Sequence, residues 1–275
     1  MQPLTVSLLQ THTHWHDAAA NRALFDDLFA QVPSAAQLVV LPEMFSTGFT
    51  MDSSQVAESM EGATVAWMRE RAQSLGKVLC GSMVISAADQ YFNRFIWAMP
   101  DGELRWYDKR HLFRMANEHE HYAAGSERIT LELDGWRICP AVCYDLRFPV
   151  WLRNRGDYDV LLVVANWPAA RQVAWQSLLR ARAIENQAYC VGVNIVGDDG
   201  NGLHYAGVRG SMPMMVKSCP SAVMRPRLSL KFCLGRVCRK RANNFRSILM
   251  LMISPCLDSG VSSWIRIKVM NEVMS

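Results

Sequence analysis

Three reactive side chains each stand directly after an apolar run that is typical of a β-strand. Glu43 follows LVVLP, Lys109 follows LRWYD, and Cys143 follows ICPAV. Together these types suit nucleophilic catalysis, in which a carboxylate takes the thiol proton and a cation faces developing negative charge. Taken singly, each residue is more typical of an ordinary position: a solvated loop, a surface charge, or core packing. The chemistry therefore depends on whether the fold brings the three together.

The surrounding pattern alternates predicted strands with predicted helices. Alternating or continuous apolar residues indicate strands, and apolar residues spaced three and four apart indicate helices. Asp101-Gly102 predicts a two-residue hairpin turn, because Asp-Gly supports positive φ angles. This order predicts an α/β protein whose sheets are buried on both faces. The predicted strands are 4–10, 37–43, 78–85, 91–100, 103–109, 136–143, 159–166 and 190–196, and the predicted helices are 15–32, 62–75 and 171–187.

Composition restricts the class of protein. The 275 residues are 50% hydrophobic and 20% charged, which argues against wholesale disorder and a coiled-coil rod. No apolar run approaches the roughly 20 residues of a membrane span. The apolar segment at 4–9 is too short for a signal peptide and lacks a positively charged segment before it. We therefore expect a cytoplasmic globular protein that does not associate with membranes.

Three motifs, in order and spacing, resemble those of the nitrilase, or carbon–nitrogen hydrolase, superfamily. They are LPEMFSTGF at 41–49, YDKRHLF at 107–113 and CYDLRFP at 143–149. NEHEHYAAG at 117–125 resembles the stretch that carries the second glutamate of that family, which places it at Glu118. ANWPAAR at 165–171 and the helix after it match as well. The resemblance covers about residues 4–207 and implies a four-layer αββα sandwich over one domain, 1–207.

The resemblance also implies a mechanism without a metal or an organic cofactor. Cys143 would be the nucleophile, and Glu43 would take its proton, because a thiol with an ordinary pKa of about 8.5 is mostly protonated at neutral pH. Lys109 and the backbone N–H of Tyr144 would stabilise the oxyanion. Glu118 would fix the position of the lysine or share in proton transfer.

The residues in and around these motifs look most like those of the bacterial omega-amidases. This similarity implies a small-molecule partner, an ω-amide such as 2-oxoglutaramate, and a homodimer. Arg147 or Arg171 would pair with the substrate carboxylate, although an ordinary structural ion pair is an equal alternative for both. Tyr144, Phe148 and Trp167, with Phe45, would form the walls of the pocket, although aromatic residues near strand ends more often belong to a core.

Two other readings stay open at this point. The same nucleophile, base and lysine serve nitrile and N-carbamoyl hydrolysis, so another carbon–nitrogen hydrolase activity is the nearest alternative. A metal site is the second, because histidines and carboxylates cluster in two strings. Neither string has the i, i+4 histidine pair with a glutamate that zinc proteases use. The strings are His12, His14 and His16, and then His111, Glu118, His119, Glu120 and His121.

The net charge of +4 averages two different compositions. Residues 1–207 carry 17 Lys and Arg against 23 Asp and Glu, whereas residues 208–275 carry 12 against 2. A basic tail is compatible with nucleic-acid binding, which is a distant alternative. The four tail cysteines, at 219, 233, 238 and 256, lack the paired Cys-x-x-Cys spacing of a zinc ribbon. Because an out-of-frame origin gives the tail another explanation, we expect no nucleic-acid partner.

An adjacent reading frame explains the tail better. The resemblance stops at Gly207, and methionine has a single codon, so Met214-Met215 encodes aspartate and Met215-Val216 encodes glycine in the neighbouring frame. The following codons permit Glu-Ile, which completes the turn that the family has after this point. In the same register, LMLMISPC at 249–256 permits the acidic run Asp-Ala-Asp-Asp-Phe-Thr-Leu. We interpret 208–275 as an out-of-frame translation, not a native domain, and expect it to disrupt the C-terminal strands.

Overall fold

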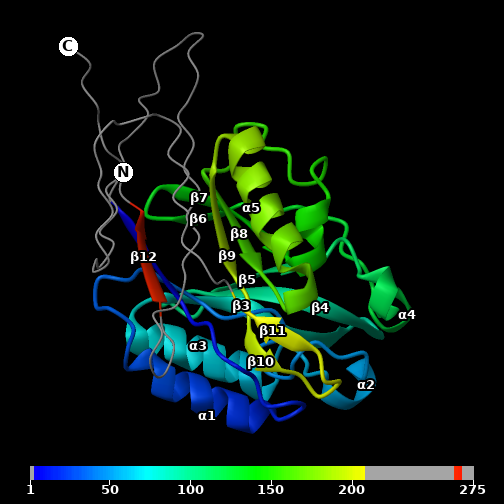
Figure 1. Ribbon diagram of the computed structural model, residues 1–275. Helices are drawn as coiled ribbons and strands as arrows, with labels where there is room; N and C mark the ends of the chain where they lie inside the picture. Colours follow the sequence, from blue (N-terminus) through cyan, green and yellow to red (C-terminus); the bar gives the residue numbers. More distant parts are fainter. Residues whose placement is uncertain (1–2, 208–262, 268–275) are drawn as a thin grey trace, which may run out of the picture.

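Two β-sheets packed face to face form the centre of the molecule (Figure 1). The computed structural model describes residues 3–207 and 263–267. In spatial order, the larger sheet contains β12 (Ser263–Ile267), β1 (Leu4–Leu8), β2 (Leu38–Val40), β3 (Val78–Ala87), β4 (Gln90–Ala98) and β5 (Leu104–Asp108). The smaller sheet contains β6 (Leu131–Leu133), β7 (Trp136–Val142), β8 (Val160–Val164) and β9 (Tyr189–Val193).

Alternation along the strands divides the larger sheet into two faces. On β2, Leu38 and Val40 belong to the core between the sheets, whereas Val39 belongs to a second core on the outer side. On β4, Phe95 faces inward and Ile96 outward in the same way. Since successive strand side chains point to opposite faces, both faces of this sheet must be covered.

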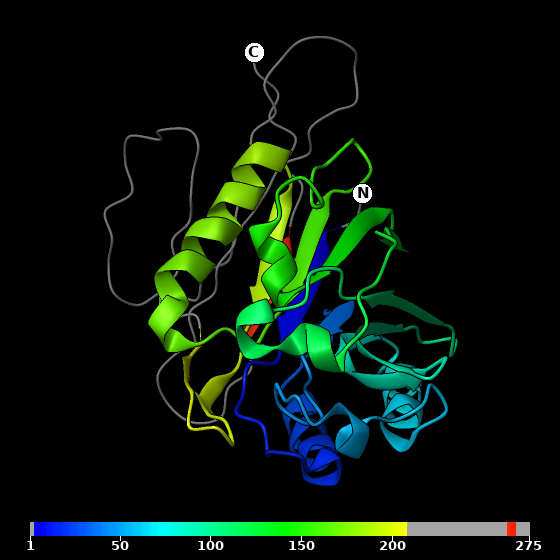
Figure 2. The same cartoon turned by 90° about the vertical axis from the view of Figure 1, so that its right-hand side faces the viewer.

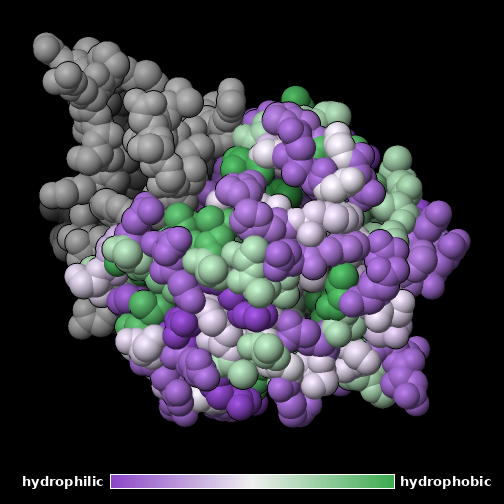
Figure 3. All heavy atoms as spheres, turned by 90° about the horizontal axis from the view of Figure 1, so that it is seen from below, coloured by the Kyte–Doolittle hydropathy of each residue, from purple (hydrophilic) through white to green (hydrophobic). Residues whose placement is uncertain are grey.

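Helices provide that cover. α1 (Ala18–Phe29) and α3 (Ala63–Leu75) pack on the outer face of the larger sheet, and α5 (Gln172–Asn186) packs on the smaller sheet. Figure 2 shows α5 and the pair α1 and α3 on opposite sides of the two sheets. The side that includes α1 and α3 is mostly hydrophilic, with scattered hydrophobic groups (Figure 3). The order is therefore helix, sheet, sheet, helix, which confirms the αββα sandwich.

Strand direction places two of the predicted catalytic segments at the same end of the larger sheet, and the third follows β7 of the smaller sheet. β2 and β3 are parallel, β4 is antiparallel to β3, and β5 is antiparallel to β4, so β2 and β5 run in the same direction. β7 and β8 are parallel and in register, with Val142 opposite Val164. Glu43, Lys109 and Cys143 follow β2, β5 and β7 respectively.

The main elements agree with the sequence predictions, with one correction at the β4–β5 hairpin. Asp101-Gly102 predicts a two-residue turn, but Met99 N–H donates to the Glu103 carbonyl, which leaves three residues in the loop. Gly102 has φ +89°. A three-residue loop with a left-handed last residue is the next most common hairpin connection, and glycine has no Cβ to oppose it.

Several short elements have no periodic signal and were not predicted. They are α2 (Ser53–Val56), α4 (Glu118–His121), β6, and the hairpin of β10 (Val196–Asp198) and β11 (His204–Ala206). Runs of three or four residues are too short for a helical or alternating pattern to be recognised. Two of them matter for function, because α4 carries Glu118 and the β10–β11 hairpin borders the cavity described below.

The tail is described only at β12, which pairs antiparallel with β1 from Leu4 opposite Ile267 to Leu8 opposite Ser263. The rest of the interpretation of 208–275 falls outside the described residues. Within residues 3–207 and 263–267, no helix combines the length and apolar character needed to cross a membrane.

Candidate active site

Cys143 lies at the first position after β7, where the chain enters a 3₁₀ turn, Cys143–Arg147. Its backbone has φ +45°, a left-handed conformation that non-glycine residues rarely adopt. Met44 and Asn117, which adjoin Glu43 and Glu118, also have positive φ angles. Such conformations cost about 1–3 kcal/mol each and gather at functional sites. Local strain therefore marks three of the four predicted catalytic positions.

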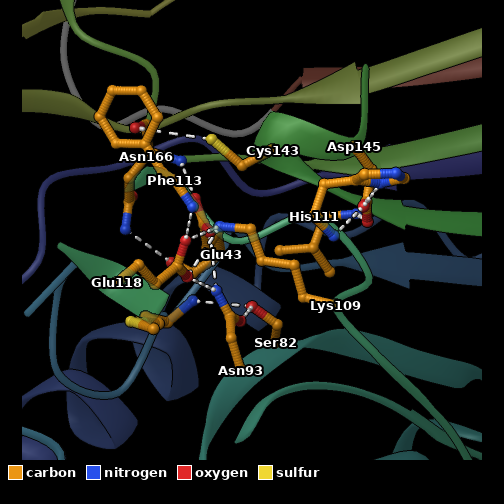
Figure 4. A network of polar contacts seen from close by, with 12 residues as sticks. Glu43, Ser82, Asn93, Lys109, His111, Phe113, Glu118, Cys143, Asp145 and Asn166 are labelled. Carbon is orange, nitrogen blue, oxygen red and sulfur yellow. Dashed lines mark hydrogen bonds and ion pairs between the residues drawn. The ribbon is translucent and has the colours of Figure 1, made fainter. Parts of the chain in front are cut away.

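Lys109 is held between two carboxylates (Figure 4). Its Nζ lies 3.0 Å from Glu43 Oε1 and 2.9 Å from both oxygens of Glu118. All three side chains are completely buried. The structure thus brings together the predicted base, lysine and second glutamate, which lie up to 75 residues apart in the sequence.

Asn166, just beyond β8, connects the base to the nucleophile. Its backbone N–H donates to Glu43 Oε2 at 2.7 Å, and its side-chain Nδ2 donates to the Glu43 carbonyl at 3.0 Å. Its own carbonyl accepts from Cys143 Sγ at 3.9 Å. One residue therefore contacts both the acid–base group and the thiol.

Asn93, on β4, supports the two carboxylates from behind. Its Nδ2 donates to Glu43 Oε1 at 2.8 Å and to Glu118 Oε1 at 3.3 Å, while its Oδ1 accepts from Ser82 Oγ at 2.8 Å. Sequence reasoning missed Asn93, Ser82 and Asn166. A signal existed for Asn93, because an asparagine inside the apolar strand YFNRFIW must find polar partners when buried.

Electrostatics keep the lysine charged. Burial lowers the pKa of Lys109, but the carboxylates of Glu118 and Glu43 more than offset this effect, so the pKa lies above its usual value. Burial raises the pKa of Glu118, and the positive charge of Lys109 opposes that rise without cancelling it. The cluster is therefore a cation facing two carboxylates in a dry environment.

The thiol is not activated at rest. Burial, followed by the negative charge of Glu43, raises the pKa of Cys143 well above its usual value, and Lys109 opposes the rise. A thiol of this kind stays protonated at neutral pH and becomes a nucleophile only when a base accepts its proton during attack. Glu43 is the carboxylate with the largest effect on this thiol.

Cys143 opens onto a cavity of about 500 Å³. Its lining combines aromatic rings with polar and charged side chains. Such a volume and lining suit a small-molecule ligand. The lining includes Trp15, Phe49, Phe113, Tyr144, Arg147, Asn166, Trp167, Arg171, Asp199 and Tyr205.

Two arginines face this cavity over aromatic rings. The Arg147 guanidinium lies 5.1 Å from the ring centre of Trp167, and that of Arg171 lies 5.0 Å from the ring centre of Phe113. Neither arginine forms an ion pair with a carboxylate among the residues that the structure describes. They are therefore free to bind an anionic group of a ligand.

Of the five predicted substrate-binding residues, four line the cavity: Tyr144, Arg147, Trp167 and Arg171. Phe148 does not, because its ring stacks on His111 with centroids 3.7 Å apart. Phe45 is also absent from the lining and packs in the core beneath α1 and α3. An aromatic residue near a strand end can point into the cavity or into the packed interior, and the local sequence does not distinguish the two.

The histidine strings do not assemble into a metal site in the described part of the chain. No group of three or more His, Cys, Asp or Glu side chains there has an arrangement that could hold a metal ion. His12 and His14 pack edge to face with each other, and His16 stacks on Trp15.

A family model described as carbon–nitrogen hydrolase matches residues 5–212. The omega-amidase YafV of Yersinia enterocolitica is 52% identical over 207 residues, which cover 75% of this chain and 80% of that protein. The 2-oxoglutaramate amidase of Bacillus subtilis is 32% identical, over 71% of this chain and 77% of that protein.

Among solved structures, XC1258 from Xanthomonas campestris is similar with a TM-score of 0.74 and 52% identity. The match covers 75% of this chain and 81% of that one. It is described as a CN-hydrolase superfamily protein with an arsenic adduct in its active site.

Proposed function

Because the chain belongs to the carbon–nitrogen hydrolase family, we propose that it acts as an omega-amidase. It hydrolyses the terminal amide of 2-oxoglutaramate-like compounds to the acid and ammonia. The observation that carries this function is the juxtaposition of Cys143, which lines a cavity bearing two arginines, with the buried Glu43–Lys109 pair. A nucleophile, a base and a substrate anion site then occur in one place.

The first half of the reaction forms a thioester. Glu43 takes the thiol proton as Cys143 Sγ attacks the amide carbon, and the carbonyl electron pair moves to oxygen. Lys109 and the backbone N–H of Tyr144 stabilise that oxyanion. The carbon–nitrogen bond then breaks, and Glu43 returns the proton to nitrogen, so ammonia leaves and the acyl group remains on sulfur.

The second half releases the acid. Water enters the position left by ammonia and gives a proton to Glu43 as it attacks the thioester carbon. The second tetrahedral intermediate breaks its carbon–sulfur bond, and the proton returns to Cys143. Glu118 does not contact the reacting atoms in this scheme; it holds Lys109 through two hydrogen bonds of 2.9 Å.

The arginines supply the preference for an acidic substrate. An ω-amide of a keto acid carries a carboxylate at the end opposite its amide, and Arg147 and Arg171 line the same cavity as Cys143. Bidentate pairing of guanidinium with carboxylate is both strong and directional. The aromatic rings beneath both guanidinium groups restrict their movement and favour one substrate orientation.

Ammonia release from a substrate panel tests the function. We expect 2-oxoglutaramate to be hydrolysed with a higher kcat/KM than a neutral aliphatic amide, a nitrile or an N-carbamoyl amino acid. Cys143→Ala should abolish release. Cys190→Ala is the matched control, because Cys190 is also buried but lies on β9 outside the site. Preferred cleavage of a nitrile or an N-carbamoyl compound would assign a different carbon–nitrogen hydrolase activity.

The proposal separates the domain at 1–207 from the tail at 208–275, which we interpret as out-of-frame. The alignment with the Yersinia protein covers 75% of the chain, and the family model ends at residue 212, so both leave most of the tail unmatched. Resequencing of the gene tests for a sequencing error. A homodimer and a cytoplasmic location are also expected, and size-exclusion chromatography and cell fractionation would test them.

A further inference from the structure

Asp145 is a fully buried carboxylate two residues after the nucleophile, and it is absent from the cavity lining. Its Oδ2 accepts from the Tyr107 hydroxyl at 2.8 Å and from the Val142 N–H at 3.0 Å. Its Oδ1 accepts from the His111 N–H at 2.9 Å, and His111 Nδ1 lies 2.8 Å from the same oxygen. A carboxylate removed from water requires donors of this kind in place of its hydration.

These donors come from the two segments that carry the lysine and the nucleophile. Tyr107 and His111 stand two residues before and two residues after Lys109, and Val142 immediately precedes Cys143. Figure 4 shows Asp145 and His111 together on one side of Lys109. One carboxylate therefore fastens both sides of the lysine segment to the beginning of the nucleophile turn.

A further hydrogen bond tightens the same connection. The Tyr107 hydroxyl, which donates to Asp145, also accepts from the Arg110 N–H at 3.2 Å. The backbone on both sides of Arg110 is thus tied to the Asp145–Tyr107 pair. Burial, together with the adjacent Asp145 charge, raises the pKa of Tyr107 well above its usual value, so its hydroxyl remains a donor at physiological pH.

We propose that Asp145 is a positioning residue that fixes the Lys109 segment against the Cys143 turn. The carboxylates of Glu43 and Glu118 hold the tip of the lysine side chain. Asp145 instead joins the two backbones. The proposal rests on the proposed function only in taking Cys143 as the nucleophile.

The separation between ammonium and thiol matters for electrostatic reasons. The positive charge of Lys109 opposes the rise in the pKa of Cys143 that burial causes. Coulomb interaction weakens with distance, so a displaced lysine stabilises both the thiolate and the oxyanion less. The left-handed conformation of Cys143 adds a second reason, because a strained turn persists only where its surroundings hold it.

Asp145→Asn is the test variant, because it preserves shape and changes one acceptor oxygen into a donor. Each oxygen of Asp145 accepts from a backbone N–H, of His111 at Oδ1 and of Val142 at Oδ2, so the new NH₂ group opposes a donor in either orientation. We expect kcat for 2-oxoglutaramate to fall about 100-fold, the effect of a small misplacement of catalytic groups. KM should stay within about threefold, because Asp145 does not contact the cavity.

A second measurement does not depend on the substrate. Alkylation of Cys143 by iodoacetamide at pH 8, followed by peptide mass spectrometry, should be about tenfold slower in Asp145→Asn, equivalent to a one-unit rise in the thiol pKa. The buried Cys139 and Cys190 serve as internal controls. If the variant is alkylated more slowly than the wild-type chain and neither releases ammonia, the proposed function is wrong while the positioning role holds.

Asp159→Asn controls for loss of stability alone. Asp159 accepts from the Arg137 N–H at 3.1 Å and from Arg137 Nε at 3.0 Å, at the opposite end of β7 from Cys143. We expect it to lower Tm but to leave kcat and alkylation unchanged. Equal kcat and alkylation losses in the two variants, or none in Asp145→Asn, would overturn the proposal.

Tyr107→Phe tests the positioning role of Asp145 if Asp145→Asn does not fold. It deletes one hydroxyl donor to Asp145 and leaves the carboxylate and its other donors in place. We expect kcat to fall about tenfold while Tm shifts by only a few degrees. An unchanged kcat in this variant would overturn the positioning role.

Discussion

Lys109 and Glu118 form a completely buried ion pair in which the lysine Nζ lies 2.9 Å from both carboxylate oxygens. Glu43 approaches the same nitrogen at 3.0 Å. The ammonium is therefore shared between two acids and cannot turn toward solvent. Each charge in the cluster is compensated by the others, so removal of one side chain should change the electrostatic energy and the pKa values of those that remain.

Replacement of the lysine should make stability depend on pH. Lys109→Met leaves two buried carboxylates without a cation, which should cost about 3–5 kcal/mol of unfolding free energy at pH 8. Burial already raises the pKa of Glu118 above 4.5, and loss of the cation raises it further. The folded variant then takes up protons that the unfolded chain does not, so its deficit should shrink from pH 8 to pH 5.

Urea unfolding of the wild-type and Lys109→Met chains at the two pH values would measure this effect. Lys77→Met is the control, because within the described residues Lys77 donates to the carbonyls of Ser34 and Ala36 and to no carboxylate. Its penalty should be the same at pH 5 and pH 8. A Lys109→Met deficit that grows on acidification would contradict the proposed compensation of charge.

Replacement of the base should affect two reactions in opposite directions. Glu43→Gln should reduce amide hydrolysis by about 10²–10⁴-fold, because the proton acceptor is lost. The charge of Glu43 is the second cause, after burial, of the raised pKa of Cys143. Its removal should therefore lower that pKa and speed alkylation by iodoacetamide at pH 8. Slower alkylation would show instead that Glu43 accepts the thiol proton in that reaction too.

The arginines should act on substrate selection. Arg147→Met and Arg171→Met should each lower kcat/KM for 2-oxoglutaramate by about 10- to 100-fold, the usual value of a hydrogen bond to a charged group. Activity toward a neutral aliphatic amide should change little. Arg153→Met is a matched control, because the one hydrogen bond of the Arg153 side chain within the described residues is to the Glu185 carbonyl, at 3.4 Å. Equal losses on charged and neutral amides would count against a carboxylate site.

The tail at 208–275 should lower the solubility, the Tm and the kcat of the protein. We expect a chain in which the codons after Gly207 are restored to the adjacent frame to be more soluble, with a higher Tm and a higher kcat than the 275-residue chain. Restored strands would cover apolar surface and sheet edges in the way that the family fold requires. Expression of both chains, with calorimetry and ammonia release, makes the comparison. Equal Tm and kcat would refute the out-of-frame interpretation of 208–275.

The elements could be predicted because their signals are local, and the apolar runs before Glu43, Lys109 and Cys143 identify strands. The catalytic trio was predicted from the resemblance of three motifs to one family, because each residue taken singly carries little signal. Asp101-Gly102 identified the hairpin but not its loop length, which depends on how β4 and β5 pair. Short elements such as α4 lack the length for a pattern, although α4 carries Glu118.

The sequence by itself determined the order of strands and helices and the residue types available for acyl transfer, because periodic burial and motif order are properties of neighbouring residues. The order of the four layers was expected only from the family resemblance. Only the tertiary structure decided how those groups are supported. Asn166 donates to Glu43 across 123 residues, and Asp145 joins Tyr107 and His111 across 38 and 34. The tertiary structure also places the Phe148 ring against His111 and outside the cavity lining. Buried polar groups need hydrogen-bond partners, and these come from residues that are close in space but distant in sequence. A linear sequence pattern does not indicate which residues they are.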